Sequence, residues 1–161
     1  MRILFLLAVC ALVVVTPACA RQPERFTPDT IIGLERAALD RWGKGDPDGY
    51  FDIMAPDVTY FDPTTDARAD GKERLKALIE PLRGKISIER AELVNPTVVG
   101  QGDVAVLTFN LISHGGRLGG GPKSDVRWNC TEVYRRIDGV WKIAHSHWSY
   151  TKPELKGPAG P

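Results

Sequence analysis

Two carboxyl groups stand beside aromatic residues in the sequence, and both are candidates for acid–base chemistry. Asp62 follows the apolar segment 58–61, and Glu132 lies within the alternating segment 127–137. Burial of a carboxylate in an apolar, aromatic cavity raises its pKa, which tunes the group to abstract a proton near neutral pH. A plainer interpretation stands beside each. Asp62 before Pro63 is a typical turn residue, and Glu132 also fits a surface or interface position on a strand.

The segment 127–150 concentrates side chains that could line a binding pocket. It holds three of the four tryptophans of the chain and two of its three histidines. A hairpin needs only aliphatic and β-branched residues, so this many rings indicate the wall of a pocket. With two aromatic residues from earlier in the chain, the predicted pocket residues are Trp42, Tyr60, Trp128, Tyr134, Ser146, His147 and Trp148.

His145 and His147 are spaced so that one face of a strand presents both rings. Neutral imidazoles are good ligands for zinc or copper, but a site needs a third ligand, and the remaining histidine, His114, lies in a predicted loop. We therefore predict no metal and no cofactor, and expect the two histidines to be hydrogen-bonded in the sheet or at an interface. Cys130 lies in mid-strand with no obvious base, which argues against a catalytic thiol.

The positions of these side chains depend on the hairpin that carries them. Asp-Gly at positions 138–139, between two alternating apolar segments, predicts a tight type I′ turn. Alternation after the turn places Trp141, Ile143, His145 and His147 on one face, and Ala144, Ser146 and Trp148 on the other. Which face lines the pocket stays open at this point, because a β-bulge shifts the parity by one residue.

The elements before the hairpin are predicted from caps, periodicity and turn residues. Thr27 and Pro28 begin a helix that ends at Gly43 and Gly45, and its apolar stripe is Ile31, Leu34, Ala38 and Trp42. A second helix runs from 46 to 54 and stops before Pro56, a short strand covers 58–61, and a third helix begins at 71. Strands follow at 85–94, 97–99 and 104–113, with a glycine-rich loop at 114–124. This order predicts an α+β fold in which helices cover one face of a curved antiparallel sheet.

The N-terminus has the pattern of an export signal. Arg2 precedes 13 apolar residues, and a stretch of small residues that suits signal cleavage follows them. The apolar segment is too short to span a bilayer. The exit fits cleavage after residue 20, and it also resembles a bacterial lipoprotein signal covering 1–18 that would leave Cys19 lipidated. We predict an exported, periplasmic or secreted protein with a linker at 21–26, a domain at 27–152 and a disordered tail at 153–161.

Length and charge narrow the classes of function further. The 161 residues are enough for one domain with a sizeable core, and a formal net charge of +1 provides no basic field. Nucleic acid is therefore not an expected partner, and a membrane is expected only through a lipid on Cys19. No internal disulfide is expected, because Cys10 and Cys19 belong to the signal.

Four motifs resemble those of a known superfamily. They lie at 42–46 (WGKGD), 57–63 (DVTYFDP), 71–73 (GKE) and 138–149 (DGVWKIAHSHWS). Together with the order of elements, they resemble the SnoaL-like branch of the nuclear transport factor 2-like superfamily, which has a cystatin-like fold. The resemblance covers residues 27–151, and the spacing most resembles the association domain of calcium/calmodulin-dependent protein kinase II and its bacterial relatives of unknown function.

The resemblance implies a cone, in which a strongly bent sheet wraps around the N-terminal helices, with a pocket at the open end and dimers formed through the sheet. It favours Glu132, Tyr134, Ser146 and Trp148 in the pocket, whereas Trp141 and Ile143 as core residues argue for the other face. The kinase association domain lines its pocket with arginines on the last two strands. At those positions this chain has Glu132 and Trp148, so the anion-binding arrangement is not carried over.

Three functions fit these observations, because this fold alone does not decide function. The first is a non-catalytic, exported, dimeric domain that binds a small and partly apolar ligand. The second is an enzyme of the ketosteroid isomerase or polyketide cyclase type, with Asp62 or Glu132 as base and Tyr60, Tyr134 or a histidine as donor to the oxyanion. The third is a structural assembly module whose cone is filled by its own side chains.

Overall fold

The computed structural model describes residues 26–152. The helices are α1 (Pro28–Trp42), α2 (Asp48–Ile53) and α3 (Lys72–Ile79), the last continued by the short 3₁₀ helix η1 (Glu80–Leu82). The strands are β1 (Met54–Phe61), β2 (Ala69–Asp70), β3 (Ile86–Ser87), β4 (Arg90–Gln101), β5 (Val104–Leu118), β6 (Ser124–Ile137) and β7 (Val140–Tyr150). The predicted signal, most of the linker and the predicted tail lie outside the described residues.

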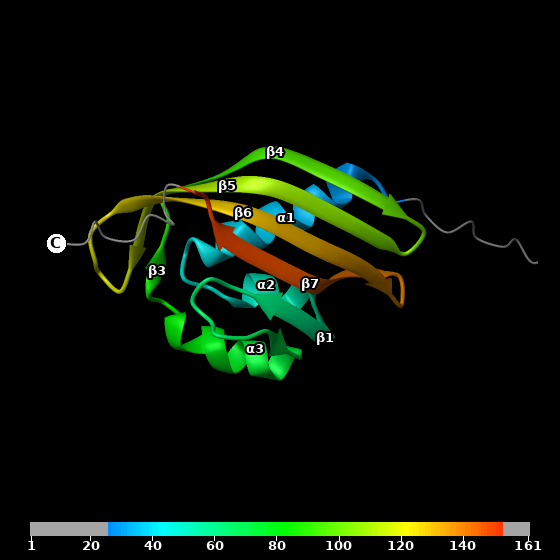
Figure 1. The fold of residues 1–161 in the computed structure, drawn as a ribbon, viewed down its shortest axis with the longest axis horizontal. Helices are drawn as coiled ribbons and strands as arrows, with labels where there is room; N and C mark the ends of the chain where they lie inside the picture. The colour runs from blue at the N-terminus through cyan, green and yellow to red at the C-terminus, as the bar shows by residue number, and fades with distance from the viewer. Residues whose placement is uncertain (1–25, 153–161) are drawn as a thin grey trace, which may run out of the picture.

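The strands form one curled sheet in the order β2-β1-β7-β6-β5-β3, and β4 also pairs with β5. The long strands β4 to β7 pair antiparallel and curve over α1, while α3 lies beside β1 (Figure 1). This confirms the predicted α+β fold, with one addition: β1 pairs with β7 in parallel. A parallel pair needs a long connection, and here the connection is the rest of the domain. Within the described part of the chain, no helix is both long and apolar enough to cross a bilayer.

Helix α1 begins and ends where its caps predict. The Thr27 hydroxyl accepts a hydrogen bond from the backbone N–H of Thr30, Pro28 occupies the first turn, and Gly43 caps the C-terminus. The residues of α1 that are buried against the sheet are Ile31, Glu35, Ala38 and Leu39. A glutamate therefore sits inside the stripe that otherwise packs apolar side chains into the core.

A β-bulge in β7 settles which side chains face the interior. The 138–139 turn has positive φ at both residues, as a type I′ turn requires. Tyr134 pairs with Ile143, but the preceding residue, Val133, pairs with His145, so Ala144 is the extra residue. The bulge shifts the parity, and side chains on both sides of it are buried: Trp141 and Ile143 before it, Ser146 after it. The two opposing arguments from sequence were each right for one half of the strand.

Several boundaries differ from the sequence-based predictions, for local reasons. The chain becomes a strand at Met54 rather than at 58, and Pro56 is tolerated there because β1 does not pair regularly with β7 between Met54 and Thr59. The expected strand at 85–94 is interrupted because the N–H of Ile88 bonds to the carbonyl of Gly43.

The glycine-rich loop is also shorter than predicted. A register shift between Ser113 and Gly116, with positive φ at Gly115, lets β5 continue to Leu118 and pair with β3. The strands predicted at 85–94 and 97–99 are joined in the same way, because an irregularity with positive φ at Asn95 lets residues 90–101 form the single strand β4. In both places the residues predicted to interrupt a strand form an irregularity within a continuous strand.

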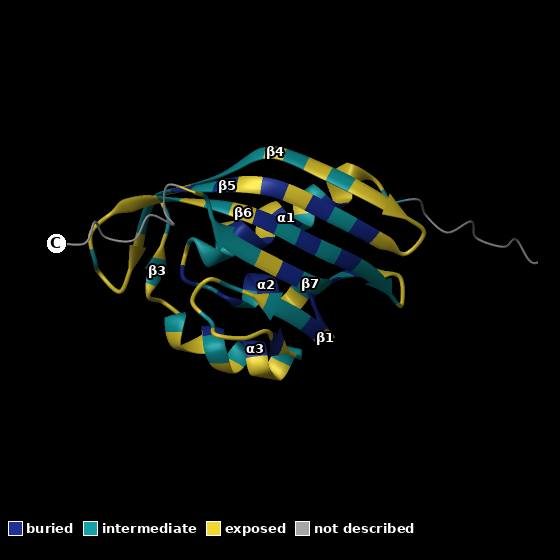
Figure 2. Cartoon of the chain, in the orientation of Figure 1, coloured by how far each residue is buried: buried dark blue, intermediate teal, exposed yellow. Residues whose placement is uncertain are grey.

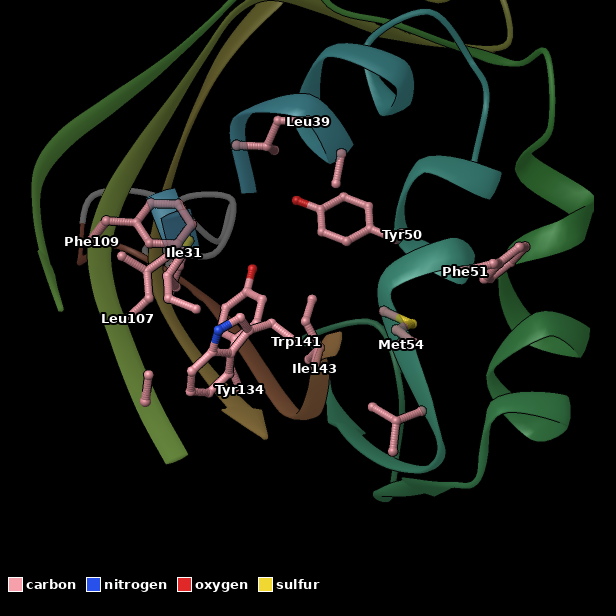
Figure 3. Packing of buried hydrophobic residues seen from close by; sticks show 14 of the residues in the cluster. Ile31, Leu39, Tyr50, Phe51, Met54, Leu107, Phe109, Tyr134, Trp141 and Ile143 are labelled. Atoms are coloured by element: carbon pink, nitrogen blue, oxygen red, sulfur yellow. The ribbon is translucent and has the colours of Figure 1, made fainter. Parts of the chain in front are cut away.

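The core lies between the inner face of the sheet and the helices. Buried and more exposed residues alternate along β5 and β6 (Figure 2), as expected for strands with one face turned inward. Leu107, Phe109 and Ile143 from the sheet pack with Ile31 from α1 and Tyr50 from α2. The hydroxyl groups of Tyr50 and Tyr134 both point into this core (Figure 3), although the surrounding side chains are apolar. They must therefore have a polar partner inside the cone.

Candidate functional site

A cavity of about 660 Å³ opens at one end of the cone, within the range of pockets that hold small ligands. Side chains from all three α-helices and from β1, β3, β5, β6 and β7 reach it. Its apolar wall includes Leu39, Met54, Leu78, Ile79, Leu82, Ile86, Ile88, Leu111 and Val126, and its aromatic wall consists of Trp42, Tyr50, Tyr60, Trp128, Trp148 and Tyr150. The cone is therefore not filled by its own side chains.

Trp148 is the centre of the aromatic wall. Its ring makes edge-to-face contacts with Tyr50, Phe109 and Trp128, at centroid distances of 6.4, 5.8 and 6.0 Å. Trp42 extends the wall through Tyr50 at 6.2 Å. Edge-to-face pairs of this kind add to the energy of burial and fix the ring orientations. The wall is thus a preformed surface that presents ring faces and edges to a ligand.

Glu35 lies directly behind this wall and is completely buried. The Tyr50 hydroxyl donates a hydrogen bond of 2.7 Å to its Oε1 atom, and the Tyr134 hydroxyl donates one of 2.8 Å to its Oε2 atom. Burial raises the pKa of Glu35 to about 7, although the two tyrosine hydrogen bonds favour the charged form and lower it. Glu35 is the polar partner that the two core tyrosines require.

Glu132 is a second, completely buried carboxyl group on the inner face of β6. The Ser146 hydroxyl donates a hydrogen bond of 2.9 Å to its Oε1 atom, and the Trp148 indole N–H donates one of 2.9 Å to the Ser146 oxygen. Its Oε2 atom has no hydrogen-bond partner among the described residues. Burial, and then the charge of Glu35, raise the pKa of Glu132 well above its usual value. We call Glu35 and Glu132 the acid pair.

The acid pair must hold a proton near neutral pH. Glu35, Ser113, Glu132 and Ser146 are the buried polar side chains in the described part of the chain, so no buried lysine, arginine or histidine there offsets the two carboxyl groups. Two nearby carboxylates in an apolar interior cannot both ionise without a large cost. Tyr50 and Trp148 belong to the cavity wall. Tyr50 is hydrogen-bonded to Glu35, and Trp148 is linked to Glu132 through Ser146. The acid pair is therefore one layer of side chains away from any ligand.

Asp62 has two sets of contacts, one on the cavity wall and one in a turn. It lines the cavity, where the Tyr60 hydroxyl donates a hydrogen bond of 2.9 Å to its Oδ2 atom. It also shapes the turn after β1, because the backbone N–H of Thr64 donates to its Oδ1 atom over 2.7 Å and the Thr64 hydroxyl donates to the same atom. Asp62 and Tyr60 thus place a carboxylate beside a hydroxyl group on the wall.

The predicted pocket residues fall into three groups. Trp42, Tyr60, Asp62, Trp128 and Trp148 line the cavity. Glu132, Tyr134 and Ser146 do not reach it, because they are buried behind the aromatic wall. His147 is corrected to the outer face: its neighbour Ser146 is buried, so alternation turns the imidazole outward, beside Asn110 and Asn129 in a shallow depression of the sheet.

The sequence reasoning missed Glu35 and Tyr50. Glu35 is four residues after Ile31 and three before Ala38, so the helical period places it on the buried stripe. A charged residue on an apolar stripe was the available signal. No comparable signal marked Tyr50, because its role depends on the Glu35 carboxyl group that accepts its hydrogen bond.

His145, the other histidine of the hairpin, packs within the protein. The Thr59 hydroxyl and Nδ1 of His145 are 2.7 Å apart, and Phe61 lies against both imidazole rings, at centroid distances of 5.8 Å from His145 and 5.7 Å from His147. Burial lowers the pKa of His145 and favours the neutral ring. Across residues 26–152, no group of three or more histidine, cysteine, aspartate or glutamate side chains is arranged to hold a metal ion.

Comparison with known proteins decides the family. The SnoaL-like domain profile matches residues 36–153, which is most of the chain. The chain belongs to the SnoaL-like family. This SnoaL-like domain is similar to the crystal structure of a candidate ketosteroid isomerase from Parabacteroides distasonis, with 36% identity over 83% of this chain and 95% of that one, and a TM-score of 0.67. None of the curated proteins gave a significant match.

More distant solved structures share the fold alone. The CaMKII hub of S. rosetta is 22% identical over 80% of this chain and 99% of that one, with a TM-score of 0.63. A nuclear transport factor 2-like protein from Cytophaga hutchinsonii is 18% identical over 78% of this chain and 99% of that one, with a TM-score of 0.64. The resemblance to this superfamily and to kinase association domains is confirmed.

Proposed function

We propose that this SnoaL-like domain binds a small, largely apolar ligand in the cavity at the open end of the cone. The observation that carries the proposal is the cavity itself: about 660 Å³ of space lined by six aromatic side chains. Burying apolar ligand surface against such a wall is favourable by roughly 25 cal/mol per Å². A preformed wall also keeps the entropic cost of binding low.

The arrangement of the carboxyl groups supports binding over catalysis. A general base has to come within hydrogen-bond distance of the proton that it removes. Glu132 is completely buried behind Trp148, and Glu35 is completely buried behind Tyr50. Neither can touch a ligand in the cavity while the wall keeps this conformation. The open cavity also argues against a purely structural assembly module, whose cone would be packed shut.

The test is a substitution that fills the cavity without touching the acid pair. Leu78 on α3 is half-buried and lines the cavity, whereas its neighbour Ala77 is exposed and does not. We expect Leu78→Trp to weaken binding of the uncharged fluorescent dye Nile red at least tenfold, and the matched control Ala77→Trp to leave it unchanged. Equal loss in both variants, or no binding of the dye to the unaltered protein, would count against the proposed site.

An isomerase is the second candidate function, favoured by the Asp62–Tyr60 pair. The Asp62 carboxylate on the cavity wall provides a base that a substrate could reach. The Tyr60 hydroxyl donates to it over 2.9 Å and becomes a donor for the substrate oxygen once the carboxylate has taken up a proton. The similar protein from Parabacteroides distasonis is described as a candidate ketosteroid isomerase. Conversion of a β,γ-unsaturated ketosteroid to its conjugated isomer, followed by ultraviolet absorption and abolished in Asp62→Asn, would establish this activity. An unchanged rate in Asp62→Asn would exclude Asp62 as the base.

Export and dimerisation remain proposals that rest on the sequence. We infer export from the apolar segment that follows Arg2, and dimerisation through the sheet from the resemblance to the superfamily. Cell fractionation of the full chain tests the first, and Cys19→Ala distinguishes a lipid anchor, which it removes, from simple cleavage, which it leaves intact. Sedimentation equilibrium tests the second, with a single monomeric species as the contrary result.

A further inference from the structure

We propose that the ligand carries a positive charge: an apolar molecule with an ammonium group, held in the aromatic cavity above the acid pair. This inference rests on the proposed function and specifies the class of ligand. It follows from the sign of the charges around the cavity, from the rings that form its wall and from a carboxylate oxygen that lacks a partner.

The charges around the cavity are mostly negative. Among the described residues that line it, Asp62 is the acidic one, and the acid pair lies directly behind the wall. Within the same set the lining cation is Arg117, which is exposed near the end of β5, where it pairs with Ser87. A cationic ligand group placed deep in the cavity is therefore surrounded by carboxyl groups, whereas an anionic group there would face repulsion in a medium of low dielectric constant.

The wall suits a cation for a second reason. A cation is attracted to the faces of aromatic rings, most strongly tryptophan, and rings of this kind recognise quaternary ammonium groups. The tyrosine hydroxyl of Tyr50 donates to the Glu35 carboxylate, and the indole N–H of Trp148 donates to Ser146, which donates to Glu132. Tyr50 donates directly to a carboxyl group and Trp148 does so through Ser146, and donating in this way makes each ring richer in electrons and a better partner for a positive charge.

The acid pair itself lacks a counter-charge. The Oε2 atom of Glu132 is buried with no hydrogen-bond partner in the part of the chain that the structure describes. A buried carboxyl oxygen that makes no hydrogen bond is costly, so native proteins rarely keep one without a use. A cation one layer away stabilises the ionised form of this group, and no lysine or arginine in the described part of the chain is buried beside it.

Binding of a cation is then linked to release of a proton. The titratable groups that face the acid pair are Tyr50 from α2, Tyr134 and Cys130 from β6 and Tyr60 from β1, and each of these is neutral near pH 7 because burial raises its pKa. The carboxyl groups are thus the ones that titrate. A cation favours their charged form, so its affinity rises with pH through the pKa of Glu35 at about 7.

The experiment compares two probes that differ only in charge. The first is choline phenyl ether, a quaternary ammonium whose charge does not change with pH. The second is its neutral isostere, in which a tert-butyl group replaces the trimethylammonium group. Both compete with Nile red for the full chain. We expect the cation to bind about tenfold more tightly than the isostere at about pH 8, and the preference to shrink severalfold at about pH 5.5.

Two carboxamide variants assign the effect to the acid pair. Glu35→Gln and Glu132→Gln keep the side-chain shape, remove the charge and are expected to reduce the preference for the cation at about pH 8. The matched control is Asp57→Asn, which removes an exposed carboxylate paired with Arg135 and leaves the preference unchanged. If a glutamine variant does not fold, calorimetry on the unaltered protein answers the same question, because protons released on binding change the heat according to the buffer.

The outcomes separate this inference from the proposed function. If Nile red and the neutral isostere bind and the cation binds no better, the protein is a ligand-binding domain but the inference is overturned. Release of no protons on binding of the cation overturns it as well. If neither the probes nor Nile red bind, the proposed function fails and the inference fails with it.

Discussion

The Tyr50 hydroxyl on α2 donates a hydrogen bond of 2.7 Å to Oε1 of Glu35 on α1, and through it the cavity wall is joined to a buried acid. The same carboxyl group receives a second hydrogen bond from Tyr134 on β6, so Glu35 holds two helices and the sheet together at one point. A carboxyl group at such a position makes the stability of the fold depend on pH.

Stability should fall as the pH rises from 5 to 8. The pKa of Glu35 is raised from 4.5 to about 7 in the folded protein, so the folded state binds more protons than the unfolded state within this interval. Its contribution is complete below about pH 4.5 and is lost as the pH rises through about 7. A shift of this size corresponds to about 3 kcal/mol of unfolding free energy, measured by urea denaturation at both pH values.

Glu35→Gln is the variant that checks this prediction. It cannot ionise, so its unfolding free energy should change much less over the same interval. The part that remains belongs to Glu132, whose pKa is also raised, and with the opposite sign to His145, whose pKa is lowered. Carboxyl groups whose pKa is lowered by ion pairs, such as Asp57 beside Arg135, stabilise the fold above about pH 4. Their contribution to the unfolding free energy is lost only below this pH interval. A variant as sensitive to pH as the unaltered protein would contradict the assignment to Glu35.

Ser146→Ala should destabilise the domain by about 1–3 kcal/mol. The serine hydroxyl donates to Glu132 and accepts from the Trp148 indole, so its removal leaves two buried groups without a partner. Chemical denaturation at about pH 6 measures the effect. Ser149→Ala, on the outer face of the same strand, is the control and should change stability by no more than about 0.5 kcal/mol. Similar losses in both variants would mean that the hydrogen bonds of Ser146 contribute nothing specific.

The sequence was sufficient to predict the helices, the hairpin and the family, because each depends on local signals. The cap at Thr27 and Pro28 and the turn at 138–139 carry their own geometry, and the structure confirms both. The extent of β4 and β5 and the parallel pairing of β1 with β7 depend on contacts between distant segments. No pattern of neighbouring residues in the sequence predicts such contacts.

The candidate site was predictable only in part for the same reason. The aromatic wall follows from residue type and alternation, so Trp128 and Trp148 could be assigned to it. The bulge at Ala144 was foreseen as a source of ambiguity, but nothing in the sequence locates it, and it decides that Ser146 faces inward and His147 outward. Glu35 escaped notice because its meaning arises from Tyr50 and Tyr134, which lie 15 and 99 positions away in the chain.

Deletion of Ala144 tests the role of the bulge. Without the extra residue, simple alternation already places Trp141, Ile143, Ser146 and Trp148 on one face, and Tyr134 and Val133 keep their partners Ile143 and His145. We therefore expect the variant to fold, with native near-ultraviolet circular dichroism and an unfolding free energy lowered by no more than about 3 kcal/mol. Deletion of Gly120, an exposed residue of the loop between β5 and β6, is the control and should be tolerated. Loss of the folded state after deletion of Ala144 would show that the bulge itself is required, and not only the shift in parity that it provides.

Cys130 should react with thiol reagents only when the structure opens. It is 4% exposed on the inner face of β6, and burial, followed by the charges of Glu132 and Glu35, raises the pKa of its thiol. Because the thiolate is the reactive form, native Cys130 should be labelled several orders of magnitude more slowly than a free cysteine. The measurement uses a chain with Cys10→Ser and Cys19→Ser, so that Cys130 is the only thiol. Its labelling rate should rise with urea in step with unfolding, whereas rapid labelling in the absence of urea would mean that the inner face of β6 opens locally beside the acid pair.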